Sequence, residues 1–496
     1  MEQDEIGSTC DSRPLKRSRN AMENQEHAHN YHGLKTPPGL ENAAGAGSAS
    51  QRLGELYSAN VFAKIWGVAQ RAFSMSSPPV LYPEYTKPGS TGYVYRELEF
   101  WTSGFFPGCL YLLLERQRKY PHKVRRLDIS VPEHELHELQ LQFACKWWTA
   151  SLYPNATLKT THDLGFMITP WARAAWELDH DIRGYDAVIT AARSLMTRYS
   201  PVVGCIRSWD TCVTKRYSFQ EPDKDFLVIV DNLMNLDTLF WAAARLRDDS
   251  MYAAALSHAK ISQRYHVRAD NSTAHVVVFD PANGTVKSVI TNQGYADTSC
   301  WSRGQAWAIA GFAQTYKWTQ DESFLETAKA CADYFMNRLP PNAIPPWDFQ
   351  APSSEPQPTD TSAAMIASYG MLLIHEAEVA AGRPSVYLQH ALRITESVCA
   401  FHVNSPARFV TRDVLTETPD AETSGTQKML TVDMGAGPET ILNGATINNY
   451  EFAPRRWANH GLVYADYFFL LVGNKLLDMG IGESYRWLTF EEPCTR

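Results

Sequence analysis

The chain has 496 residues, with 46 lysines and arginines against 54 aspartates and glutamates, and its formal net charge is −8. Hydrophobic residues make up 44% of the chain, charged residues 20% and aromatic residues 12%, which is typical of a large globular protein with a full core. The mild negative charge argues against nucleic acid or an anionic membrane as the main partner, and no apolar run reaches the ~18–20 residues of a membrane span.

The first 54 residues are predicted to form a disordered tail, because they carry too few core-forming side chains to offset the entropy of ordering. Their Ile, Leu, Val and aromatic residues are Ile6, Leu15, Tyr31, Leu34, Leu40 and Leu53. The opening residues are acidic and polar with no apolar segment behind them, so we expect no secretion signal and a cytoplasmic protein. The basic run at 13–19 (RPLKRSR) is a weak candidate for a nuclear address.

Nine cysteines are spread along the chain, and none forms a CxxC pair. Because the count is odd and no secretion signal is present, we expect buried, reduced thiols rather than disulfides. They are Cys10, Cys109, Cys145, Cys205, Cys212, Cys300, Cys331, Cys399 and Cys494.

From about residue 55 onward, apolar residues recur at the i, i+3, i+4 and i+7 spacing of helices, bounded by Pro, Gly or capping residues. Helices are predicted at 56–73, 104–116, 133–151, 169–199, 226–247, 251–266, 299–318, 321–337, 361–381, 387–402 and 461–477. One β-hairpin is expected from 275–280 and 286–290, around Asn283-Gly284.

The predicted helices alternate between two kinds of composition. Segments such as 299–318 are rich in small and aromatic residues, whereas segments such as 321–337 carry many charges. Wholly buried helices that alternate with amphipathic ones indicate two concentric layers. We therefore predict an all-α fold, a closed α/α barrel over residues 55–496, with an open superhelical solenoid as the alternative. Polar, proline-containing stretches at 217–224 and 340–358 are expected to be loops at one rim.

The segment 226–244 contains two charged residues, Asp231 and Asp237, among apolar ones. Read as a buried helix, it places Asp231 on one stripe with Asn235 and Thr238, facing a wet cavity. A buried carboxyl group has a raised pKa, which suits general acid and base catalysis. A capping or hydrogen-bonded structural aspartate is an equal alternative.

A second carboxylate, Asp163, follows His162 in the sequence HDLGF. Gly165 ends this segment and Pro170 stands early in the next helix, so Asp163 is expected on a turn. Two carboxylates that flank a bond are the usual arrangement in sugar hydrolases. The alternative is a loop-capping residue.

In the segment 292–307, Arg303 is the one charge from residue 298 up to Lys317, and it stands among Trp301, Gln305 and Trp307. Its planar guanidinium fork suits a carboxylate, and the neighbouring aromatic faces suit a sugar ring. The alternative is an internal salt bridge, with Asp297 as the first candidate partner.

No metal or cofactor is expected. The sequence His134-Glu135-Leu136-His137 lacks the spacing of HExxH and is expected on a solvated helix face. The chain contains no phosphate-binding glycine loop, no G-x-S-x-G elbow and no dinucleotide fingerprint.

Three segments together resemble the unsaturated glucuronyl hydrolases, glycoside hydrolase family 88. They are HDLGF around Asp163, IVDNLMNL around Asp231 and QGYADTSCWSRGQAWAI around Arg303, with WTSGF before them and DTSAA after them. The resemblance covers roughly residues 56–477. It implies an (α/α)6 barrel of six helical hairpins with a few short β-hairpins in rim loops. The implied substrate is an oligosaccharide that ends in a Δ4,5-unsaturated uronic acid left by a polysaccharide lyase.

The resemblance also implies roles for single residues. Asp231 would be the general acid and base, and Asp163 its partner carboxylate. Asn292 stands where members commonly carry His before Gln-Gly; Asn can hydrogen-bond but cannot titrate, which leaves the preferred uronide or sulfation pattern open. The implied substrate-binding residues are Trp101, His275, Asn292, Gln293, Trp301, Arg303, Trp307 and Tyr467, with Trp209 as a further match.

The implied reaction is hydration of the C4=C5 double bond of the terminal glucuronic acid. Protonation at C4 and addition of water at C5 give a hemiketal, which opens and releases the unsaturated sugar as a keto acid, without metal or covalent intermediate. Two alternatives stay open: an unsaturated rhamnogalacturonyl hydrolase that acts on pectin-derived substrates, and a non-catalytic sugar-binding barrel. The unsaturated oligosaccharide is the one partner expected, and the oligomeric state is not predicted.

Overall fold

The computed structural model describes residues 53–121, 136–352, 357–416, 425–453 and 456–481. The chain divides into two units, Met1–Ala46 and Gly47–Arg496, and the fold below is that of the second. The predicted tail up to residue 52, Cys10, Cys494, His134 and Glu135 lie outside the described residues. Leu53, which we assigned to the tail, is 4% exposed and is followed by a 3₁₀ helix, η2 (Gly54–Tyr57), so the described fold includes it.

Among the described residues, six helices form an inner ring. Neighbours in this ring pack directly: α9 with α11, α11 with α13, α13 with α15, α15 with α3, and α3 with α7. The short helix α6 (Leu164–Met167) packs on both α7 and α9 and closes the ring. The inner helices are α3 (Phe105–Lys119), α7 (Thr169–Asp179), α9 (Leu236–Leu246), α11 (Ser302–Thr319), α13 (Thr361–Ala380) and α15 (Val463–Asp478).

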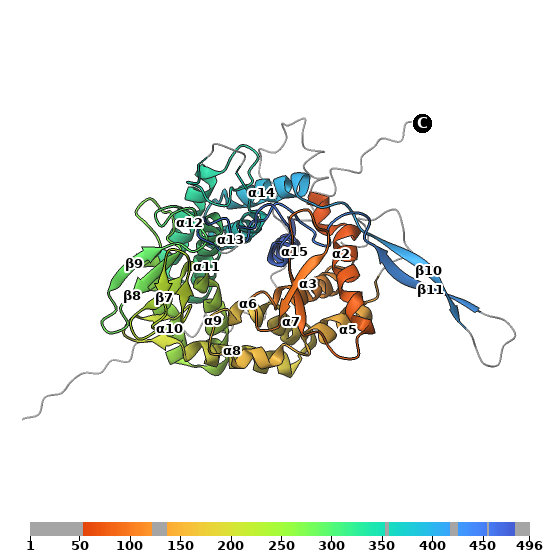
Figure 1. Ribbon diagram of the computed structural model, residues 1–496, viewed down its shortest axis with the longest axis horizontal. Coiled ribbons are helices and arrows are strands. Elements are labelled where there is room, and N and C mark those ends of the chain that lie inside the picture. Colours follow the sequence, from red (N-terminus) through yellow and green to blue (C-terminus); the bar gives the residue numbers. More distant parts are fainter. Residues whose placement is uncertain (1–52, 122–135, 353–356, 417–424, 454–455, 482–496) are drawn as a thin grey trace, which may run out of the picture. The chain divides into compact units, whose positions relative to one another are not determined.

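Six further helices in the described part of the chain cover this ring from outside and lie at the periphery in Figure 1. Each packs on an inner helix, as α5 does on α3 and α12 does on α11. They are α2 (Ala59–Ala69), α5 (Glu138–Thr149), α8 (Ile182–Met196), α10 (Asp249–Tyr265), α12 (Glu322–Arg338) and α14 (Tyr387–Phe401). The fold is an (α/α)6 barrel, which confirms the predicted all-α class.

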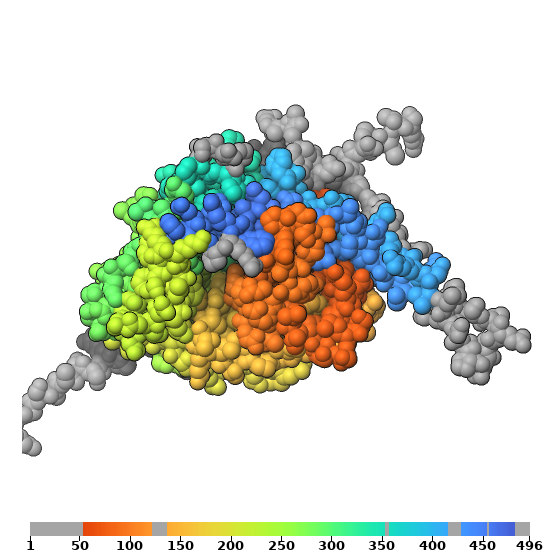
Figure 2. All heavy atoms as spheres, in the orientation of Figure 1, coloured from red at the N-terminus to blue at the C-terminus, as the bar shows by residue number. Residues whose placement is uncertain are grey.

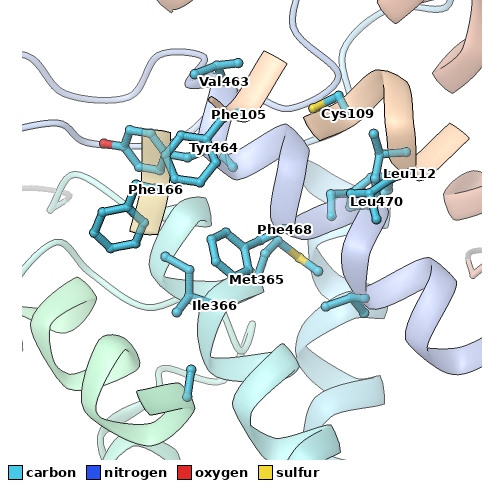
Figure 3. Packing of buried hydrophobic residues seen from close by; sticks show 14 of the residues in the cluster. Phe105, Cys109, Leu112, Phe166, Met365, Ile366, Val463, Tyr464, Phe468 and Leu470 are labelled. Carbon is cyan, nitrogen blue, oxygen red and sulfur yellow. The ribbon is translucent and has the colours of Figure 1, made fainter. Parts of the chain in front are cut away.

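The two layers follow from the two compositions seen in the sequence. All residues of α11 from Ser302 to Ala313 are buried, whereas α12 buries one face, including Phe324, Leu325 and Ala328. The inner helices approach closely: a Cβ on Gly370 of α13 would lie 2.8 Å from the backbone nitrogen of Ala310. Figure 3 shows the side chains of α3, α13 and α15 packed together in the core.

One predicted helix begins as a strand. The residues 226–229 form β7 (Phe226–Ile229), which pairs with β8 (Val276–Phe279), and β8 pairs with β9 (Val286–Ile290), all antiparallel. The predicted hairpin is therefore confirmed, but the helix predicted at 226–247 starts ten residues late, at α9. The error has a physical cause: a short apolar run that is buried on both faces has no period that distinguishes strand from helix.

A second predicted helix is divided in two. The segment 169–199 forms α7 and α8, which meet where His180 adopts the left-handed conformation with φ 51°. Asp181 caps α8 by accepting a hydrogen bond from the backbone nitrogen of Arg183. Neither His180 nor Asp181 is Gly or Pro, the residues that most often mark the end of a helix, so the sequence pattern did not predict the break between α7 and α8.

The remaining strands form two-stranded hairpins. They are β1 (Leu81–Thr86) with β2 (Tyr93–Glu97), β3 (Tyr199–Ser200) with β4 (Cys205–Ile206), β5 (Cys212–Val213) with β6 (Ser218–Phe219), and β10 (Arg408–Thr416) with β11 (Gly425–Asp433). The pair β10–β11 extends outward from the helices in Figures 1 and 2. Within the described residues, no helix is long and apolar enough to cross a membrane.

Candidate active site

The N-termini of the inner helices bring together residues that lie far apart in the sequence. Asp163 is the N-cap of α6, Trp301 the N-cap of α11 and Asp360 the N-cap of α13. Asp231 lies in a 3₁₀ helix, η5 (Val230–Asn235), between β7 and α9. Helix N-termini carry partial positive charge, so this end of the barrel favours anionic groups.

Asp231 is partly exposed as a residue, yet its Oδ1 atom is buried and has no hydrogen-bond partner. Burial raises the pKa of this carboxyl group to about 7; the attraction of Arg303 opposes the rise and the charge of Asp163 adds to it. The backbone nitrogen of Val230 donates to the carbonyl of His275 at 3.0 Å, which ties η5 to β8. Asp231 is therefore a carboxylic acid that can both give and take a proton near neutral pH.

Asp163 is held beside it by its own loop. Thr161 Oγ1 donates to Asp163 Oδ2 at 2.7 Å, and His162 Nε2 lies 3.2 Å from Asp163 Oδ1. His162 is fully buried, and burial lowers its pKa, so the imidazole is neutral. Asn235 accepts from the backbone nitrogen of Gly165 at 2.8 Å and contacts His162 Nδ1 at 3.3 Å.

The predicted wet stripe of Asp231, Asn235 and Thr238 is wrong. Asn235 is 0% exposed and joins η5 to the loop of Asp163, and Thr238 is 1% exposed and bonds to Thr169 Oγ1 at 2.8 Å. The stripe assumed a continuous helix through 231, but α9 begins at Leu236. Asp231 and Asp163 still meet, through the contact of α6 with η5.

Aromatic rings form a continuous cluster next to α6, whose N-cap is Asp163. Trp101 lies 5.1 Å from Tyr464 and 5.7 Å from Phe166, and Phe166 lies 5.1 Å from Trp307, between ring centroids. Tyr464 and Trp307 are buried within this cluster, whereas Trp101 is half-buried. The Nε1 atom of Trp307 is buried without a hydrogen-bond partner.

His275 stands between two tryptophans, 4.6 Å from Trp301 and 6.0 Å from Trp209 between ring centroids. Its Nδ1 accepts from the backbone nitrogen of Asn292 at 3.1 Å, and its Nε2 is buried without a partner. Burial and the nearby Arg303 lower the pKa of His275 to about 3, so the imidazole is neutral.

Asn292 and Gln293 are half-buried on the loop that follows β9. Asn448 Nδ2 donates to the carbonyl of Asn292 at 3.2 Å, which links this loop to the segment 446–450. Asn292 therefore lies beside His275, through the hydrogen bond from its backbone nitrogen to Nδ1.

Arg303 is an internal ion-pair partner, but not of Asp297. Its Nη1 lies 2.7 Å from Asp360 Oδ2 and donates to the carbonyl of Thr446, and its Nη2 donates to the carbonyl of Ile447 at 2.8 Å. Both side chains of the pair are buried, at 2% and 0% exposure. Asp297 instead pairs with Arg216 at 2.9 Å, so the first candidate partner was wrong. The sequence motif DTSAA contains Asp360, but nothing in it indicates an arginine partner.

Tyr467 packs on the same rings, with its ring 5.3 Å from that of Phe105 between centroids. It lines a cavity of about 310 Å³ together with Phe166 and Tyr369. Tyr464, one helical turn earlier on α15, was not predicted, and its ring lies 5.4 Å from the Arg303 guanidinium. The sequence HGLVYADYFFL contains both tyrosines, and only the helix register decides between them.

The described part of the chain contains no group of three His, Cys, Asp or Glu side chains placed to hold a metal ion. His137 does not lie on a solvated helix face but caps α5, accepting from the backbone nitrogen of Leu139 at 3.1 Å. The described cysteines are buried free thiols, as predicted.

No family model matches the chain. Among curated proteins, it is 34% identical over 278 residues to the unsaturated glucuronyl hydrolase of Formosa agariphila, an alignment that covers 55% of this chain and 63% of that protein. It is 32% identical over 295 residues to the unsaturated chondroitin disaccharide hydrolase of Streptococcus agalactiae, covering 59% and 67%. It is 32% identical over 292 residues to the unsaturated glucuronyl hydrolase of Bacillus sp. GL1, covering 58% and 71%.

Solved structures give the same family. An unsaturated glucuronyl hydrolase specific for heparin superimposes with a TM-score of 0.67 and 26% identity, over 87% of this chain and 98% of that one. For the Bacillus sp. GL1 enzyme the TM-score is 0.64 at 24% identity, over 86% and 98%, which supports the fold alone. The sequence alignments span less than two thirds of the first relative and 71% of the third. Taken with the carboxyl pair and its aromatic surroundings, these similarities show that the chain belongs to the unsaturated glucuronyl hydrolase family.

Proposed function

We propose that this protein releases the non-reducing-end Δ4,5-unsaturated glucuronic acid from lyase-generated oligosaccharides by hydrating the C4=C5 double bond. The observation that carries the proposal is Asp231, whose Oδ1 is buried without a partner and whose pKa burial raises to about 7. Such a carboxyl group is protonated in a useful fraction of molecules at neutral pH, and it can also act as a base after losing its proton.

In the proposed mechanism, Asp231 gives its proton to C4 of the enol ether, and positive charge develops at C5 and the ring oxygen. The Asp231 carboxylate then takes a proton from water as the water oxygen bonds to C5, which restores the acid. The resulting hemiketal opens with cleavage of the bond from C5 to the ring oxygen, and collapse at C1 expels the remaining sugar. Asp163, oriented by Thr161, stabilises the developing positive charge and raises the pKa of Asp231.

The surrounding residues are proposed to orient the uronide. Trp101, which is half-buried, offers a ring face, and the unengaged Nε2 of His275 offers a hydrogen-bonding atom. The side-chain amide of Asn292 can form hydrogen bonds, but its charge does not change with pH. The names of the relatives extend to chondroitin and heparin substrates, so glycosaminoglycan disaccharides are the first class to test.

The test is a panel of unsaturated disaccharides from chondroitin, heparin and pectin-type lyases, followed by the absorbance of the enol ether. Loss of absorbance with the glucuronic acid substrates supports the proposal. Loss with rhamnogalacturonan products alone would assign the related pectin activity instead. Binding by calorimetry with unchanged absorbance for every substrate would identify a sugar-binding barrel and overturn the proposed reaction.

A further inference from the structure

Asp360 is a buried carboxylate shared by a helix N-terminus and a guanidinium. Its Oδ1 accepts from the backbone nitrogen of Ser362 at 3.1 Å and from Ser362 Oγ at 2.5 Å. Its Oδ2 accepts from Arg303 Nη1 at 2.7 Å. Among the described residues, Asp360 is the one carboxylate within ion-pair distance of Arg303.

Arg303 in turn lies next to the element that carries Asp231. A Cβ on Gly304 would lie 3.3 Å from Val230 Cγ1, so the first turn of α11 packs directly on η5. The carbonyls of Thr446 and Ile447 hold the guanidinium from the side of the rim. Most N–H groups of the guanidinium therefore donate to groups within the protein, and Asp360 balances its charge.

The remaining titratable groups around η5 leave few charges to act on Asp231. They are Asp163, the N-cap of α6, with the neighbouring His162, Asp237 on α9, His258 on α10, His275 directly before β8, and Tyr464 on α15. Burial lowers the pKa of all three histidines and raises that of Tyr464, so these four groups are neutral near pH 7. Asp237 pairs with Arg173 at 3.0 Å. The charges that act on Asp231 are thus Asp163 and Arg303.

We propose that Asp360 is a positioning residue of the reaction: its carboxylate holds and neutralises the Arg303 guanidinium, so that Asp231 keeps the proton it donates. The inference rests on the proposed function of Asp231. Without Asp360, Arg303 would be a buried cation with no anionic partner, and the other carboxyl group whose charge acts on it is that of Asp231.

The test is Asp360→Asn, which keeps the acceptor for the α13 cap and removes the charge. We expect the pH midpoint above which kcat/KM declines to fall by about one unit or more, because an unpaired opposite charge lowers the pKa of a nearby carboxyl group. The matched control is Asp348→Asn, a buried carboxylate that accepts from Tyr295 N at 2.8 Å and Ser299 Oγ at 2.6 Å rather than from Arg303. The control is expected to lose stability with an unmoved midpoint.

A second readout is independent of turnover. The ¹³C carboxyl resonance of Asp231, assigned by its absence in Asp231→Asn, is titrated in the wild type, in Asp360→Asn and in Arg303→Gln/Asp360→Asn. We expect its pKa to fall in Asp360→Asn and to rise above the wild-type value in the double variant, which lacks the opposing cation and leaves neither member of the ion pair buried with an unpaired charge. An unmoved pKa in both variants would overturn the proposal. A wild-type protein that is inactive on every disaccharide but shows these shifts would overturn the proposed function, and with it the role of Asp360 in the reaction, and leave only the electrostatic effect of Asp360 on Asp231.

Discussion

At the end of β7 the backbone turns into a 3₁₀ helix, and this turn places Asp231 at the convergence of the helix N-termini. A helix through the same residues would have put Asp231 on one stripe with Asn235. Instead Asn235 joins η5 to the loop of Asp163 through the backbone nitrogen of Gly165 at 2.8 Å. The carboxyl pair is thus positioned by one buried amide, and the raised pKa of Asp231 follows from its burial beside Asp163.

Asp163→Asn is expected to lower kcat/KM by about 100-fold or more, because it removes the charge that stabilises the transition state. Its pH profile should also change. Asp231 donates a proton, so activity falls as pH rises through its pKa of about 7, and the charge of Asp163 contributes to that value. The variant should therefore decline from a lower pH than the wild type in steady-state kinetics. A profile identical to the wild type would make Asp163 a structural residue.

Arg303→Lys is expected to lower the free energy of unfolding by about 1–3 kcal/mol, since an ammonium cannot reproduce the separate hydrogen bonds to Asp360, Thr446 and Ile447. Thermal unfolding measures this loss. The same variant tests whether the remaining N–H groups contact the substrate, because loss of a substrate contact raises KM by about tenfold or more. An unchanged melting temperature would contradict the ion-pair network described here.

Among the helices and strands, the sequence predicted those whose pattern fits a single secondary structure. The helical spacing of α11 and α12 and the Asn283-Gly284 turn of the β8–β9 hairpin are such patterns, and these elements were predicted correctly. The apolar run of β7 fits both a strand and a helix. The strands β10 and β11 escaped prediction because their polar residues give no hydrophobic alternation.

The residues of the site also divide into those that local sequence patterns predict and those that they do not. The segments around Asp163 and Asp231 identified the carboxyl pair without any knowledge of their spacing in the fold. Tyr464 was missed because two tyrosines one turn apart on a buried helix cannot be told apart by local sequence pattern. Arg303 and Asp360 are 57 positions apart in the sequence and belong to different helices, so no local pattern predicts that they pair.

The contact between α11 and α13 gives a prediction at this scale. Gly370→Ala should destabilise the protein by about 1–3 kcal/mol, although alanine favours helices, because its Cβ would lie 2.8 Å from the backbone nitrogen of Ala310. Denaturant unfolding measures the change. The control is Gly54→Ala, where nothing lies within 4 Å of the added carbon, and where a change within ~0.5 kcal/mol is expected. Equal effects for both would contradict the close helix packing.

For the whole molecule, the alternation of fully buried and amphipathic helices was enough to predict two layers, and closure of the ring distinguishes the barrel from the solenoid that was the alternative. Closure matters for function, because it is what directs the N-termini of α6, α11 and α13 to one place. Residues separated by more than a hundred positions then form one site.

The boundary of the folded unit can be tested by deletion. Removing residues 1–46 should leave the melting temperature and activity almost unchanged, since that stretch has few core-forming side chains. Removing residues 1–54 should cost about 1–3 kcal/mol, because it also removes Leu53, which is 4% exposed. Both are measured by thermal unfolding. A large loss from the shorter deletion would show that the barrel depends on the first unit.

An unsaturated disaccharide analogue with CH₂ in place of the bridging oxygen distinguishes hydration of the double bond, catalysed by Asp231, from displacement at C1. Displacement at C1 cannot cleave such an analogue, but addition of water across C4=C5 still removes its absorbance. We expect the wild type and Asp237→Asn, which alters the other aspartate of the same segment, to remove the absorbance. Asp231→Asn should do so at least about 100-fold more slowly. Persistent absorbance with the wild-type protein, on an analogue of a disaccharide that it cleaves, would rule out hydration.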